Sequence, residues 1–253
     1  MLDKSNKQFL DSAKQMQADE LVKFNALAQE WWNPEGKFKR VLEFNEARVN
    51  TIISGIAAHF GRDLTANKPF SGLHILDIGC GAGLICEPLA KLGADVTGVD
   101  GSEMNVQVAR AHAAESNIPV HYKHALAEDL SSDAEFDVVL NTEVIEHVPN
   151  QQALAATCAH LVAPKGLLVM ATLDRSIKSF LVAIVGAEYV LKMLPKGTHD
   201  WRFFIKPKAL AEMLAKHGMQ VKQQRGFAFN PLLQKWRVTA KPNVNYMQFY
   251  VRE

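Results

Sequence analysis

The fold is decided by residues 76–83, which read Leu76-Asp77-Ile78-Gly79-Cys80-Gly81-Ala82-Gly83. An apolar strand precedes this stretch and a helix follows it, and its glycines permit a tight turn with positive φ. Such a turn lets the backbone approach a ligand at the carboxyl end of a parallel sheet. The stretch therefore predicts a ligand site at the end of a first strand.

Downstream of this turn the pattern alternates between strands and helices. The strands are expected at 74–78, 95–99, 120–124, 136–141, 167–172, 220–225 and 246–251. The helices are expected to end at 92 and 116 and to span 151–161 and 207–217, with a turn at Pro164-Lys165-Gly166. This alternation predicts an α/β, Rossmann-like fold with a mainly parallel seven-stranded sheet and helices on both faces.

Two further segments flank or interrupt this pattern. Helical spacing at 19–32 and 45–60 predicts an N-terminal helical cap over residues 1–70. Residues 71–253 are then expected to form the sheet domain. The alternation of strands and helices is interrupted at 173–205, which we expect to be an inserted lid segment over the rim of the site.

Composition excludes several classes of function. A net charge of +1 provides no broad positive field for nucleic acid, so no nucleic-acid partner is expected. The three cysteines, Cys80, Cys86 and Cys158, lack metal-ligand spacing and fit a reducing cytoplasm. Residues 1–20 lack the features of a secretory signal or transit peptide, and no apolar run approaches the roughly 20 residues of a membrane span. We expect a cytoplasmic protein.

The glycine spacing and two carboxylates indicate the ligand. A dinucleotide-binding turn has G-x-G-x-x-G, whereas this chain has G-x-G-x-G and then Leu84. Asp77, two positions before the first glycine, suits a cationic ligand, and Asp100 at the end of the second strand can accept hydrogen bonds from both ribose hydroxyls. S-adenosylmethionine is therefore favoured over NAD; the alternative is that both carboxylates merely cap helices.

Four motifs resemble those of class I methyltransferases, namely LDIGCGAG at 76–83, VTGVD at 96–100, FDVVLN at 136–141 and PKGLLVMATL at 164–173. The resemblance implies that Gly79 and Gly81 approach S-adenosylmethionine. It also implies that Ala127 flanks the adenine and that Asn141 and Thr142 lie beside the transferable methyl group.

Five longer segments resemble the ubiquinone biosynthesis O-methyltransferases: EWWNPEGKFK at 30–39, VARAHAAESNI at 108–118, EVIEHVP at 143–149, residues 178–207, and VNYM at 244–247. The resemblance implies methyl transfer to a catechol hydroxyl of 2-polyprenyl-6-hydroxyphenol and 3-demethylubiquinol. It also implies that Arg48, in Asn45-Glu46-Ala47-Arg48, pairs with the carboxylate of the cofactor. Rival hypotheses are methylation of another small phenol or amine, and a non-catalytic lipid-binding assembly subunit.

The acceptor oxygen must lose a proton, because a phenol titrates near pH ~10. On a helical turn Glu143, Glu146 and His147 would share one face, which predicts a site for Mg²⁺ or another divalent cation that acidifies the catechol. Alternatively His147 alone is the base, or Glu146 and His147 only cap and pack. His199 and Asp200 are secondary candidates for base or substrate contact.

The inserted segment is expected to handle the isoprenoid tail. Helical spacing of apolar residues, with basic residues nearby, predicts contact of residues 175–205 with a membrane surface, or else a lid helix packed on the domain; the apolar residues are Ile177, Phe180, Leu181, Ile184 and Val185. The expected partners are a polyprenylated catechol, the inner membrane face as a peripheral site, and other enzymes of ubiquinone biosynthesis.

Overall fold

The computed structural model describes residues 32, 35–36, 39–130, 135–176, 200–230 and 235–252. Apart from Trp32, the helix expected at 19–32 lies outside these residues. So does the part of the insertion at 177–199, with its predicted amphipathic pattern and His199.

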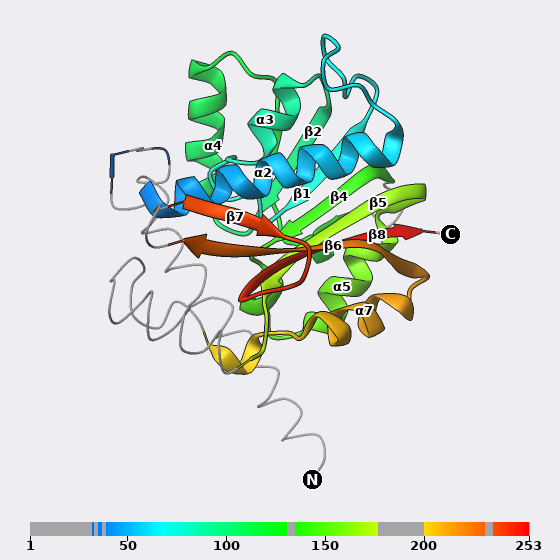
Figure 1. Cartoon of the computed structure of the whole chain (residues 1–253). Coiled ribbons are helices and arrows are strands. Elements are labelled where there is room, and N and C mark those ends of the chain that lie inside the picture. The colour runs from blue at the N-terminus through cyan, green and yellow to red at the C-terminus, as the bar shows by residue number, and fades with distance from the viewer. Residues whose placement is uncertain are drawn as a thin grey trace.

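One sheet of eight strands forms the middle of the molecule, in the order β3-β2-β1-β4-β5-β8-β6-β7 (Figure 1). The strands are β1 (His74–Ile78), β2 (Asp95–Asp100), β3 (His121–His124), β4 (Phe136–Thr142), β5 (Val162–Leu173), β6 (Met219–Asn230), β7 (Lys235–Thr239) and β8 (Asn245–Arg252). The first five strands pair in parallel, and β8 lies antiparallel between β5 and β6. The predicted Rossmann-like fold is confirmed.

The sheet has one strand more than the seven expected. Within the described part of the chain, this strand, β7, pairs only with β6, and the two lie antiparallel at the edge of the sheet. Its apolar residues, Trp236 and Val238, alternate with polar ones, but the strand is only five residues long and all of them are exposed or half-buried.

Helices cover both faces of the sheet (Figure 1). They are α2 (Lys39–Phe60), α3 (Cys86–Lys91), α4 (Glu103–Glu115), α5 (Gln151–His160) and α7 (Pro207–Ala215). One apolar cluster joins α2, α3 and α4 to one face, and a second joins α5 and α7 to the other. Strand residues alternate between the two clusters, as expected for a sheet buried on both sides. The helix expected from residue 45 begins earlier, at Lys39.

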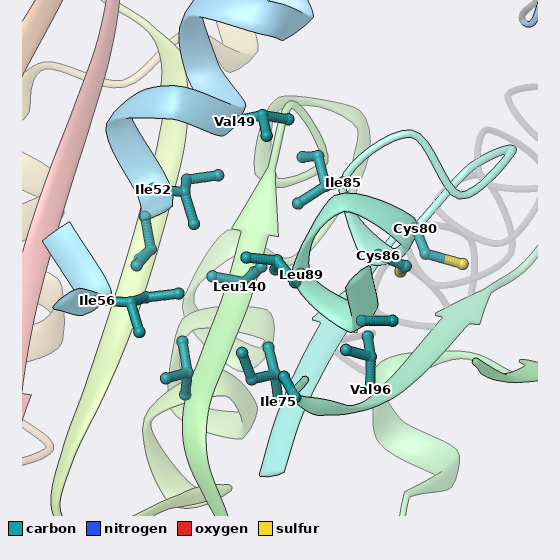
Figure 2. Packing of buried hydrophobic residues seen from close by; sticks show 14 of the residues in the cluster. Val49, Ile52, Ile56, Ile75, Cys80, Ile85, Cys86, Leu89, Val96 and Leu140 are labelled. Atoms are coloured by element: carbon teal, nitrogen blue, oxygen red, sulfur yellow. The ribbon is translucent and has the colours of Figure 1, made fainter. Parts of the chain in front are cut away.

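Figure 2 shows the packing beneath α2. Val49, Ile52 and Ile56 are spaced to lie on one side of the helix, and together with Leu140 of β4 and Leu89 of α3 they belong to the same buried cluster. Full burial of such a side chain contributes about 1.5–3 kcal/mol. The helix called a cap from the sequence thus contributes to the core of the sheet domain.

Local signals define several helix ends. The Ser102 side chain accepts a hydrogen bond from the Asn105 N–H at the start of α4, and Asn150 accepts one from the Ala153 N–H at the start of α5. α7 starts with a proline and is followed by Gly218 at φ +73°.

The turn expected at Pro164-Lys165-Gly166 is a bulge within β5. Phe136 pairs with Val162, whereas Val138 pairs with Leu167, so the intervening residues of β5 loop out of register. Lys165 adopts φ +63° there. Among the described residues, no helix combines the length and apolarity that a membrane span requires.

Candidate active site

The predicted cofactor residues meet at the carboxyl edge of three neighbouring strands, β2, β1 and β4. Strand pairing places Ile78 between Val99 and Asn141. The Gly79 N–H donates to the Val99 carbonyl at 2.8 Å, and the Asn141 side-chain amide donates to the Ile78 carbonyl at 3.4 Å. The glycine turn and the ends of the second and fourth strands therefore border one site.

Two glycines of the turn serve different purposes. Gly79 has φ +78°, and a Cβ there would lie 2.2 Å from Cγ2 of Val144, so packing excludes a side chain. Gly81 has φ +54°, and a Cβ there would meet no atom within 4 Å. The backbone at Gly81 thus borders open space, as a ligand-binding turn requires.

Asp100 fixes the conformation of this turn. One carboxylate oxygen accepts the Gly81 N–H at 2.9 Å, and the other accepts the Ser102 N–H at 2.8 Å and the Asn105 side-chain amide at 3.1 Å. Burial raises the pKa of Asp100, and these hydrogen bonds oppose that rise. Each carboxylate oxygen has about two acceptor sites, so these three hydrogen bonds leave about one site, on the oxygen that accepts the Gly81 N–H, for a ribose hydroxyl.

Asp77 is fully buried beneath the turn. Its Oδ2 accepts a hydrogen bond from the Cys86 thiol at 3.3 Å, whereas its Oδ1 has no hydrogen-bond partner in the described part of the chain. Burial raises the pKa of the Asp77 carboxyl to about 7. A buried carboxylate with an unused oxygen fits a cationic group such as an ammonium, which would favour its ionised form.

Arg48 reaches the site from α2 and is buried. Its Nη2 donates to Asn45 Oδ1 at 2.9 Å, its guanidinium lies 4.8 Å from the Phe44 ring centre, and its Nη1 is 3.6 Å from Glu143 Oε1. Burial lowers the pKa of Arg48, and nearby carboxylates, above all Glu143, oppose this. Its Nε has no partner in the described chain, so the guanidinium retains capacity for a carboxylate ligand.

The segment after β4 differs from the helical turn on which the metal prediction depended. Glu143 adopts φ +57°, and only Ile145–His147 form a short 3-10 helix, η3. Among the described residues, no group of three or more His, Cys, Asp or Glu side chains is placed to hold a metal ion. The predicted ligand set of Glu143, Glu146 and His147 is therefore not formed, because the local backbone turns Glu143 away from an α-helical register.

Two of these acids nevertheless interact. Glu146 is buried, and its Oε2 accepts the Thr172 hydroxyl at 2.7 Å. Burial, followed by the charge of Glu143, raises the pKa of Glu146 well above its usual range. The Oε1 atoms of Glu143 and Glu146 accept no hydrogen bond within the described chain. Thr172, at the end of β5, was not singled out from the sequence, although every parallel strand ends at this same edge.

The remaining predicted residues are distributed as follows. Ala127 is buried in the 3-10 helix η2 (Ala127–Asp129), Thr142 is buried at the end of β4, and His147 is half-buried. Asp200 accepts the Arg202 N–H and pairs with its guanidinium, which lowers the pKa of Asp200. Its described contacts are those of a capping residue.

A cavity of about 1450 Å³ is lined by residues of the 3-10 helix η5 (Trp201–Phe203), of α7 and of β6. Its wall includes Gln151, whose side-chain amide donates to the carbonyls of Ile145 at 3.1 Å and Phe203 at 2.6 Å. The cavity does not include the glycine turn. Through its hydrogen bond to Ile145, Gln151 connects the wall of the cavity to η3, the short helix that contains Glu146.

Comparison with known proteins agrees with this geometry. The family model for a methyltransferase domain matches residues 50–224. Ubiquinone biosynthesis O-methyltransferase from Chelativorans sp. (strain BNC1) is 48% identical over 231 residues, covering 91% of each chain. The protein of the same name from Dinoroseobacter shibae is 49% identical over 235 residues, covering 92% of this chain and 95% of its own.

Solved structures share the fold at low identity. The magnesium protoporphyrin IX methyltransferase of Synechocystis with bound SAH has a TM-score of 0.62 and 18% identity, covering 90% of this chain and 99% of its own. A possible histamine N-methyltransferase from Thermotoga maritima has a TM-score of 0.64 and 17% identity, covering 92% of this chain and 100% of its own.

Proposed function

Because the chain belongs to the ubiquinone biosynthesis O-methyltransferases, we propose that it transfers a methyl group from S-adenosylmethionine to a catechol hydroxyl of polyprenylated ubiquinone precursors. The proposed acceptors are 2-polyprenyl-6-hydroxyphenol and 3-demethylubiquinol. The identity of 46–49% over more than nine-tenths of the chain carries the family assignment.

The donor site is built from the glycine turn and three charged residues. We assign the ribose to Asp100, the ammonium group to Asp77 and the carboxylate to Arg48. Each assignment is supported by unused hydrogen-bonding capacity: an open face at Gly81, an unpartnered Oδ1 on Asp77 and an unpartnered Nε on Arg48. The ammonium and the carboxylate share the α-carbon of the methionine moiety, so Asp77 and Arg48 would hold one end of the donor and Asp100 the ribose. The sulfonium between them would then present its methyl group at the end of β4.

The acceptor site would lie beside Glu143 and Glu146. A phenol holds its proton at neutral pH, so a base or a cation must favour the phenolate. The charge of Glu143 raises the pKa of Glu146, so the two carboxylates lie close together, and Glu143 Oε1 also faces Arg48 Nη1 at 3.6 Å. Mg²⁺ binds through one or two carboxylates together with substrate oxygens and water, and Glu143 and Glu146 are the residues that would hold it. Such an ion would supply Lewis acidity, while His147 or Glu146 takes the proton; His199 remains a secondary candidate.

The isoprenoid tail would leave the site through the cavity lined by η5, α7 and β6. The cavity wall contains apolar residues, including Phe204 and Met213, and cationic residues, including Arg175 and Lys206. Apolar surface suits the tail, and the cations would face an anionic membrane surface. We therefore assign residues 175–205 to tail and membrane contact, and peripheral membrane association to the protein.

The test is transfer of labelled methyl from S-adenosylmethionine to a prenylated catechol, detected by mass spectrometry with and without a chelator. We expect turnover on the prenylated catechol, loss of turnover on chelation and recovery with Mg²⁺. Faster methylation of soluble phenols or amines would overturn the acceptor assignment. Indifference to the chelator would remove the cation and leave His147 or Glu146 as the base.

The donor site is tested separately. The variants Asp100→Ala and Asp77→Asn should abolish binding of S-adenosylhomocysteine in calorimetry, whereas the exposed Asp95→Asn on the same strand β2 should bind normally. Binding of the donor without any turnover would instead favour a non-catalytic assembly subunit.

A further inference from the structure

Trp32 contacts the glycine turn directly. Its indole N–H donates to the Ala82 carbonyl at 2.7 Å, fifty residues further along the chain. Its ring stacks on the His112 ring of α4, with 3.5 Å between ring centres and an angle of 7° between planes. Trp32 is half-buried in this position.

The carbonyl that Trp32 holds lies in the part of the turn with the least side-chain support. Ala82 is flanked by Gly81 at φ +54° and Gly83 at φ +88°, which have no side chains to restrict the peptide planes. Asp100 accepts the Gly81 N–H, and Trp32 donates to the Ala82 carbonyl. The peptide groups that join Cys80 to Gly81 and Ala82 to Gly83 are thus each anchored by a side chain from a distant segment.

The contact extends to the two helices that follow the turn and the second strand. His112 Nδ1 lies 2.8 Å from Glu87 Oε1, and the Glu87 side chain is 1% exposed. This interaction joins α4 to α3, which lie next to each other in Figure 1. Trp32 therefore stacks on a ring that is itself held by a buried carboxylate, and it contacts the turn through the Ala82 carbonyl.

We infer that Trp32 is a positioning residue for the donor, whose indole holds the Ala82 peptide in the conformation that binds S-adenosylmethionine. The inference rests on the proposed function. Since the turn is shared, docking of Trp32 and binding of the donor must strengthen each other by the same factor.

The substitution Trp32→Phe tests this, because it keeps an aromatic ring for stacking and removes only the N–H donor. A net hydrogen bond contributes about 0.5–1.5 kcal/mol, which corresponds to a loss of roughly two- to twelvefold in affinity for S-adenosylhomocysteine. Trp32→Ala removes both the N–H donor and the stacking and should weaken binding further. His112→Leu removes the stacking alone and should also weaken binding. The KM for S-adenosylmethionine should rise by a similar factor in each variant, with kcat largely retained.

The matched control is Trp236→Phe on β7, whose indole nitrogen has no hydrogen-bond partner within the described chain. This variant should bind S-adenosylhomocysteine as the wild type does. Acrylamide quenching adds a second readout: S-adenosylhomocysteine should protect tryptophan fluorescence in the wild type, and less so in Trp32→Ala.

Two results separate the possible failures. If folded Trp32→Phe and Trp32→Ala bind S-adenosylhomocysteine as tightly as the wild type, the inference is wrong and the proposed function stands. If the wild type itself does not bind S-adenosylhomocysteine, the proposed function fails first. Equal weakening in Trp236→Phe would also overturn the inference, because the effect would then not depend on contact with the turn.

Discussion

The substitution Asp77→Asn should stabilise the ligand-free protein at neutral pH while abolishing donor binding. Burial raises the pKa of Asp77 from 3.8 to about 7. At a pH between 3.8 and about 7, Asp77 is ionised in the unfolded chain and protonated in the folded chain. The contribution of Asp77 to stability is therefore fully present below about pH 4 and is lost as the pH rises towards 7.

The magnitude follows from the two pKa values. The folded and unfolded pKa values differ by about three pH units, and each unit corresponds to about 1.36 kcal/mol. The free energy of unfolding therefore falls by roughly 4 kcal/mol at most as the pH rises. Asparagine carries no charge and escapes this loss, but its amide N–H₂ must find an acceptor where a carboxylate now accepts the Cys86 thiol. We therefore expect a net gain of roughly 2 kcal/mol above pH 7.5, or about 4–8 °C in Tm.

The assay is urea unfolding of both proteins between pH 5 and pH 8. The stability of wild type relative to Asp77→Asn should decline across this range, and the exposed Asp95→Asn should show no such pH-dependent difference from wild type. S-adenosylhomocysteine should raise the Tm of the wild type and of Asp95→Asn, but not that of Asp77→Asn. A pH-independent difference between wild type and Asp77→Asn, or normal ligand binding by the variant, would refute the reasoning.

Three further predictions concern other contacts of the site. Gly83→Ala places a Cβ 2.2 Å from the Tyr122 hydroxyl at φ +88°, so it should lower the free energy of unfolding by about 2 kcal/mol or more, and Tyr122→Phe should partly restore it in urea titrations. Thr172→Val removes the donor to Glu146 and should move the acidic limb of the pH–rate profile to higher pH; an unchanged profile would show that Glu146 does not titrate in the rate. Asp100→Asn should weaken S-adenosylhomocysteine binding at least tenfold in calorimetry, because an amide nitrogen replaces one of the two acceptor oxygens that hold the turn.

The donor half of the site could be placed from the sequence because its residues depend on strand ends. Asp77, Gly79 and Asp100 stand at or next to the ends of short apolar strands, and parallel strands bring such ends to one edge. The strand at 74–78 has the predicted bounds, and the predicted second strand ends one residue before the observed one. The strand ends and the residues placed at them follow from local sequence pattern alone, without tertiary contacts.

The acceptor half could not be placed in this way, because tertiary contacts decide its backbone. Val144 packs against Gly79, and Glu146 bonds to Thr172 on a strand that starts after the intervening helix. These contacts accompany the positive φ at Glu143 and the short 3-10 helix, which helical periodicity does not anticipate. The contacts of Trp32 are also tertiary, because its partners, Ala82 and His112, lie fifty or more residues away along the chain.

The position of β8 has a consequence for synthesis of the protein. Although β8 is the last described strand in the chain, it lies between β5 and β6, so neither of these can complete its pairing until Asn245–Arg252 have been translated. While the nascent chain is growing, the facing edges of β5 and β6 have unpaired backbone groups that other chains can occupy. Protection by a chaperone at the ribosome would matter most during this interval, and any premature stop before residue 245 would leave two open sheet edges rather than a smaller enzyme.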